Sequence, residues 1–100
     1  MSDNLNSKTF SEHLRTSFKV PMAGADPTLL ELVEVVESNA SPAMEQFSVF
    51  FLGPQTLGQG MRSLEHEQMG SFDLFLVPVA VEGDRVRYEA AFTRFREKQG

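Results

Sequence analysis

The chain has 100 residues, 41% hydrophobic and 23% charged, a composition that predicts one globular domain and excludes a disordered chain or two independent cores. The absence of cysteine excludes disulfides, thiolate catalysis and thiolate-bound metal centres. The net charge of −5 argues against nucleic-acid binding, and no apolar stretch reaches the roughly 18 residues of a membrane span. We expect a cytoplasmic protein with a disordered segment at residues 1–8, a single β-rich domain at 9–96 and a tail at 97–100.

The first predicted element is a short helix that begins near Thr9. Thr9 and Glu12 have the spacing of a capping box, and Phe10 and Leu14 fall on one helical face. A short strand is expected over residues 18–20. It should end at Pro21, because proline cannot donate to a ladder, and the following MAGADP is expected to be a turn or loop.

The stretch TLLELVEVVES, residues 28–38, is compatible with two structures. Glutamates at every third position, after an Asp-Pro pair, indicate a helix. Val33, Val35 and Val36 favour a strand, because β-branched side chains lose rotamer freedom in a helix. We favour a strand, bulged or regular, and keep the helix as the alternative.

Two more strands are predicted in the middle of the chain. Residues 45–52 alternate, with Phe47, Val49 and Phe51 on one face. The glycine-rich GPQTLGQG, residues 53–60, predicts a loop with positive-φ positions, and residues 61–66 form a short strand closed by the turn EQMG.

The last two strands form a predicted hairpin around Gly83 and Asp84. A two-residue loop there places Glu82 opposite Arg85. Unbroken counting then gives the pairs of the core face: Val81 with Val86, Val79 with Tyr88, Val77 with Ala90, and Phe75 with Phe92. Pro78 lies inside the first strand of this hairpin, which also predicts a bulge or barrel corner nearby.

Together these elements predict a mainly β fold, a small antiparallel barrel or sandwich of about six strands with one short N-terminal helix. The helix is expected to cover the apolar end of the last hairpin with Phe10 and Leu14.

Several motifs, in order, resemble a known pattern: GPQ at 53–55, QG at 59–60, LEH at 64–66, Gly70, LFLVP at 74–78 and RYEAAF at 87–92. They are similar to those of a bacterial family of about 100 residues, a domain of unknown function. The resemblance runs from the FSEHL helix to Phe92. It implies a small, mainly β domain with no assigned activity, cofactor or catalytic residue.

The candidate metal-binding and catalytic residues are better explained by structural or surface roles. Glu65, His66 and Glu67 are adjacent, but on a strand the two carboxylates point away from the imidazole, so the three cannot converge on one metal ion. We interpret His66 as a polar turn histidine and His13 as a surface residue. The sequence contains no nucleophile elbow, and we predict no catalytic residue, no metal ligand and no cofactor.

The candidate partner-binding residues lie in the predicted loop at residues 53–60, in the predicted strand at residues 61–66 and at the C-terminal end. They are Gln55, Gln59, His66, Arg94, Phe95 and Arg96. Residues 1–84 carry four Lys or Arg against twelve Asp or Glu, so we expect Arg85 and Arg87 to neutralise the acidic strands in part.

The leading hypothesis is a non-enzymatic interaction or assembly module that binds a protein partner or self-associates, and binds neither nucleic acid nor membrane. The alternative is a small-ligand-binding, or enzymatic, barrel with a site near His66. A weaker alternative is an accessory subunit of a phage-tail-like assembly.

Overall fold

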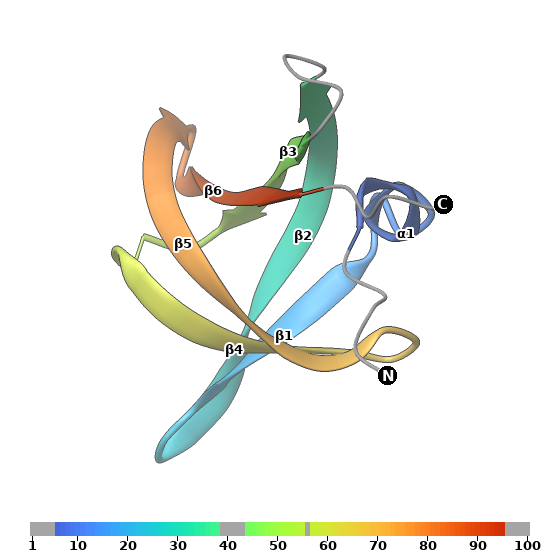
Figure 1. Cartoon of the computed structure of the whole chain (residues 1–100). Coiled ribbons are helices and arrows are strands. Elements are labelled where there is room, and N and C mark those ends of the chain that lie inside the picture. The colour runs from blue at the N-terminus through green and yellow to red at the C-terminus, as the bar shows by residue number, and fades with distance from the viewer. Residues whose placement is uncertain (1–5, 39–43, 56, 96–100) are drawn as a thin grey trace.

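The computed structural model describes residues 6–38, 44–55 and 57–95, which form an antiparallel β-barrel with one short helix (Figure 1). The elements are α1 (Ser7–Ser11), β1 (Ser17–Met22), β2 (Ala25–Ser38), β3 (Met44–Gly53), β4 (Gly60–His66), β5 (Gly70–Glu82) and β6 (Arg85–Phe95). The predicted mainly β class is confirmed, and of the two predicted architectures the chain adopts the barrel.

The barrel consists of two three-stranded meanders, and its strand order is β1-β2-β3-β6-β5-β4. The meanders meet at two junctions of unequal extent. At one, β3 and β6 are in register from Met44↔Phe95 to Gly53↔Val86. At the other, β1 and β4 share a single registered pair, Lys19↔Glu65. We call this second junction the seam of the barrel.

The interior is filled by alternate side chains of all six strands, as expected where every second residue of a barrel strand points inward. Its buried hydrophobic residues are Phe10, Phe18, Val20, Leu30, Leu32, Phe47, Val49, Phe51, Leu57, Leu64, Leu74, Leu76, Val86, Tyr88 and Ala90. The predicted inward face of β3 is therefore confirmed.

Phe10 of α1 closes one end of the barrel. Its fully buried ring lies within 6.5 Å, centroid to centroid, of four other rings. These rings belong to Phe18, Phe47, Phe72 and Phe92, on four different strands. A helix of five residues has no stability of its own, so this aromatic packing holds it in place.

The predicted capping box at Thr9 is wrong. The N-cap is Asn6, whose side-chain oxygen accepts the Thr9 N–H at 2.8 Å, and asparagine is among the strongest N-cap residues. The helix ends at Ser11, before Leu14 can share its buried face, and Leu14 is 39% exposed. Arg15 then takes a positive φ of 68° as the chain turns into β1.

Strand β1 does not end at Pro21. The chain accommodates the proline by a shift in register between Val20 and Met22, so the ladder tolerates the missing N–H. Of the turn or loop predicted at MAGADP, the chain forms a tight turn, which is shorter than expected because β1 ends at Met22 and β2 begins at Ala25. Residues 28–38 are strand, which excludes the helical alternative, and a bulge lies between Leu32 and Glu34.

The predicted hairpin loop at Gly83 and Asp84 is confirmed. Glu82 pairs with Arg85 and Val81 with Val86, and Gly83 has the positive φ of 66° that this tight turn requires. Beyond Ala80↔Arg87 the predicted register is wrong, because the ladder shifts between Pro78 and Ala80. The sequence predicts a bulge near Pro78. The predicted pairs, however, assume an unbroken ladder, and a bulge changes which side chains of β5 face the core.

The shift reverses the predicted faces of β5. Leu74 and Leu76 are buried and Phe75 is exposed, because a register change of one residue exchanges the two faces of a strand. Val79, at the bulge, and Val81, which keeps its predicted pairing near the turn, are also exposed, so neither is a core residue. Tyr88 and Ala90 of β6 face the core as predicted.

Candidate functional site

A cleft of about 530 Å³ lies along the seam, between the start of β1 and the end of β4. Its lining residues are Thr16, Ser17, Lys19, Glu65, His66, Glu67 and Gln68. The cleft exists because β1 and β4 pair only at Lys19↔Glu65 instead of zipping together along their length. It is the place where the sequence analysis expected any small-ligand site.

His66 forms part of this cleft, and both of its ring nitrogens are hydrogen-bonded. Nδ1 accepts the backbone N–H groups of Gln68 and Met69, at 3.0 and 3.1 Å. Nε2 lies 3.0 Å from the Thr16 hydroxyl oxygen. That hydroxyl donates its own proton to the His13 carbonyl at 2.6 Å, so it can only accept from His66. The network therefore fixes the neutral tautomer with its proton on Nε2.

The surroundings of His66 reinforce this protonation state. Its ring packs against Phe18, with centroids 4.4 Å apart, and meets the His13 ring edge-on at 4.8 Å. Burial and the nearby His13 lower the pKa of His66, and Glu67 opposes them more weakly. A neutral imidazole with both nitrogens engaged organises the β4–β5 turn, in agreement with the predicted turn histidine.

His13 links α1 to the same turn. Its Nδ1 donates to the Thr9 carbonyl at 2.9 Å, and its Nε2 lies 2.9 Å from the Gln68 side-chain oxygen. It was predicted to be a surface residue, but it is half-buried and makes contacts between segments 55 residues apart. The short distances between α1, β1 and the β4–β5 turn could not be anticipated from residues that far apart in the sequence.

The three predicted partner-binding residues whose side chains the structure describes, Gln55, Gln59 and His66, do not lie together. Gln55 and Gln59 are exposed in the β3–β4 connection, whereas His66 lies at the opposite end of β4. Arg94 and Phe95 belong to the end of β6, where the structure describes the backbone alone, and Arg96 lies outside the described residues.

An apolar surface that the sequence analysis missed lies on the outside of β4 and β5. Met61 and Phe75 are direct cross-strand partners, 63% and 48% exposed. Val77, two residues along β5 on the same face, is half-buried. We call Met61, Phe75 and Val77 the outer patch. The apolar run LFLVP hides it in the sequence, because either face of such a run can be read as the core.

Acidic side chains surround the outer patch. Asp73 accepts the Ser63 hydroxyl at 2.7 Å and Glu89, the cross-strand partner of Val77, accepts the Ser48 hydroxyl at 2.7 Å. Glu65 is exposed at the end of β4. Within the described parts of the chain, no Lys or Arg lies within 4.0 Å of these three carboxylates.

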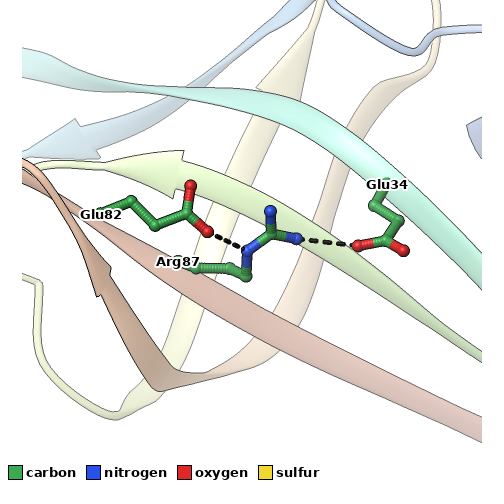
Figure 2. Close-up of polar contacts among 3 residues, drawn as sticks. All are labelled: Glu34, Glu82 and Arg87. Carbon is green, nitrogen blue, oxygen red and sulfur yellow. Dashed lines mark hydrogen bonds and ion pairs between the residues drawn. The ribbon is translucent and has the colours of Figure 1, made fainter.

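Three carboxylates on β2 and β5, those of Glu31, Glu34 and Glu82, are paired with arginines. Figure 2 shows Arg87 between two carboxylates: its Nε donates to Glu82 at 2.6 Å and its terminal nitrogen to Glu34 at 2.9 Å. The hydrogen bond to Glu82 raises the pKa of Arg87, as does the Glu34 carboxylate. Arg85 lies 3.6 Å from Glu31, so the predicted neutralisation of the acidic strands by these arginines is confirmed.

Two further findings bear on the kinds of site available. In residues 6–38, 44–55 and 57–95, no three His, Cys, Asp or Glu side chains are grouped so that they could hold a metal ion. None of the helices in that part of the chain has both the length and the apolar character needed to span a bilayer.

The fold and surface define a small six-stranded barrel with a filled interior and an exposed apolar patch that has unpaired carboxylates beside it in the described part of the chain. Residues 5–92 match the family described as a domain of unknown function (DUF6916), and the chain belongs to this family. The resemblance noted in the sequence is thus confirmed. No curated protein and no solved structure gave a match.

Proposed function

We propose that this chain is a non-enzymatic protein-interaction module, which binds a partner protein through the outer patch. The observation that carries the proposal is the pair Met61 and Phe75, two large apolar side chains that stand side by side in solvent. Large apolar side chains grouped on a surface and rimmed by polar residues are characteristic of binding sites. We further propose that the module acts in the bacterial cytoplasm, a location that its acidic, cysteine-free composition supports.

The interior of the barrel supports this function over ligand binding. Its described side chains are packed into one continuous hydrophobic cluster. The side chains available to a partner therefore lie on the outside, where a rigid scaffold presents loops and sheet faces.

Ligand binding in the seam cleft is the second candidate, and its volume of about 530 Å³ favours it, because ligand sites commonly enclose about 300 to 1,000 Å³. The chemistry of the lining favours it less. His66, the expected polar group, is committed to the protein's own network, so a ligand would have to displace Thr16 or the turn amides. The idea of a phage-tail-like accessory subunit gains no specific support.

The test is site-specific photo-cross-linking in the cells that naturally produce the chain. Replacing Phe75 with benzoylphenylalanine keeps an aromatic ring in the patch and should give one discrete heavier adduct after illumination. The same replacement at Leu29, which is 55% exposed on β2, is the matched control and should give none. An absence of adduct at Phe75, or the same adduct at both positions, would contradict the proposal.

A further inference from the structure

Strand β4 has an open edge. All seven of its residues, Gly60–His66, are in register with β5, but on the other side Glu65 alone is in register with β1. About half of the residues in an antiparallel strand direct their N–H and C=O groups away from a given neighbour. Between residues 60 and 64, those groups have no registered partner in β1.

The geometry of the seam shows why β1 does not cover this edge. In Figure 1, β1 and β4 cross and then diverge, β1 toward its hairpin with β2 and β4 back toward the β3–β4 connection. The side of residues 60–64 that β1 leaves unpaired is therefore the edge to which a further strand can be added.

The two edges at the seam differ in how they are protected. Natural edge strands are commonly guarded by proline and lysine, and β1 carries both, as Pro21 and Lys19. Residues 60–64 of β4 carry neither. The one charged side chain among them, Arg62, donates to the carbonyl of Leu57 in the β3–β4 connection.

Given the interaction function proposed above, we infer that the partner docks as an added strand on residues 60–64 of β4 and brings both apolar and cationic side chains. An apolar side chain opposite Met61 extends the outer patch, because directly opposed side chains on neighbouring strands are in contact. A Lys or Arg opposite Ser63 reaches over this small residue toward Asp73, its cross-strand partner on β5.

Charge complementarity selects this partner over a second copy of the chain. The acidic groups beside the patch, Asp73, Glu65 and Glu89, have no cation within 4.0 Å among the described residues. The chain as a whole carries a net charge of −5, so two copies repel each other, whereas a basic segment is attracted. The inferred segment is thus extended, with a cationic and an apolar residue two positions apart.

The probe is a synthetic heptapeptide, Thr-Lys-Thr-Val-Thr-Lys-Thr, with blocked ends, titrated into the full ¹⁵N-labelled chain and followed by amide chemical shifts. The largest shifts should fall at residues 60–64. Exchanging both lysines for glutamates should weaken binding about tenfold or more, and raising the salt concentration should weaken the lysine peptide. N-methylation at every second residue should abolish binding in one of its two registers, because it removes the ladder donors.

Met61→Lys supplies the protection that β4 lacks and should abolish peptide binding, while Leu29→Lys, at an equally exposed apolar site on β2, should leave it unchanged. Equal binding of the glutamate and lysine peptides would overturn the inferred charge. Undiminished binding of both N-methylated peptides, or shifts centred elsewhere, would overturn strand addition. A dimer in sedimentation that Met61→Lys converts to a monomer would replace the inferred partner by a second copy.

The two proposals fail separately. A cross-link at Phe75 together with no peptide binding would leave the interaction function standing and remove the added strand. Peptide binding without any cross-link in cells would show a strand-accepting edge but contradict the interaction function.

Discussion

Gly53→Ala tests the packing of the barrel at a single methyl group. Gly53 is buried at the end of β3, and its φ is not in the left-handed region, so the backbone itself accepts alanine. On backbone entropy alone the substitution should stabilise the fold by about 0.4 to 1 kcal/mol. The added Cβ, however, would lie 2.3 Å from Cδ2 of Leu30 and 3.7 Å from its Cγ.

The clash decides the sign of the effect. Leu30 is fully buried, so its methyl group cannot move aside without displacing the packed core around it. Overpacking of this kind costs about 1 to 3 kcal/mol, which exceeds the entropic gain. We expect Gly53→Ala to lower the free energy of unfolding by about 1 to 2 kcal/mol and the Tm by about 4 to 16 °C.

Urea denaturation of four proteins measures the effect: the original chain, Gly53→Ala, Leu30→Val and the double variant. Leu30→Val shortens the side chain that the new methyl group meets, so the double variant should be more stable than the sum of the two single effects predicts, by about 1 kcal/mol or more. Additive effects, or a Gly53→Ala variant at least as stable as the original, would refute the assigned contact.

Three further predictions concern stability. Phe10→Ala should cost about 3 to 5 kcal/mol in urea denaturation, whereas Leu14→Ala, at a partly exposed site outside α1, should cost less than about 1 kcal/mol; similar losses would contradict the closing role of Phe10. Tyr88→Phe removes the hydroxyl that donates to the Pro54 carbonyl and should cost about 0.5 to 1.5 kcal/mol with an unchanged m-value, a larger change in m arguing for wider rearrangement. The pKa of His66 is lower in the folded chain than its value of about 6.5 in the unfolded chain, so below pH 6.5 the unfolded chain binds more protons. The free energy of unfolding should therefore fall as the pH drops from about 6.5 through the folded pKa, and His66→Gln should flatten this dependence. An NMR titration that places the His66 pKa at or above 6.5 would contradict it.

The elements with strong local signals could be predicted from the sequence. In the first half of β3 polar Gln46 and Ser48 alternate with apolar Phe47 and Val49, which identifies the buried face, and the Gly-Asp pair predicts the β5–β6 turn. The β-branched run in β2 outweighed its helix-like glutamate spacing, in the way that side-chain packing usually outweighs weak intrinsic propensity. Each of these features depends on neighbours within a few residues.

What could not be predicted depends on parity and on distant contacts. In β5 both faces are apolar, so only the position of the bulge decides which residues enter the core. The order of polar and apolar residues does not reveal that position. The N-cap is Asn6 and not the predicted Thr9. The helix that Asn6 begins is held in place by Phe10, whose four aromatic partners come from residues 18 to 92. The His13–Gln68 and Thr16–His66 contacts likewise exist only once the barrel has closed.

The candidate site follows from the same bulge. Closing six strands into a barrel requires the two longest, β2 and β5, to bend, and each carries a shift in its ladder. On the β4 side of the shift in β5, Leu74 and Leu76 enter the core, and Phe75 is left outside against Met61. An unbroken strand would have placed Phe75 in the core and Leu74 and Leu76 on the outside. The exposed aromatic ring is thus a consequence of how the barrel closes, and it is the feature on which the proposed partner binding rests.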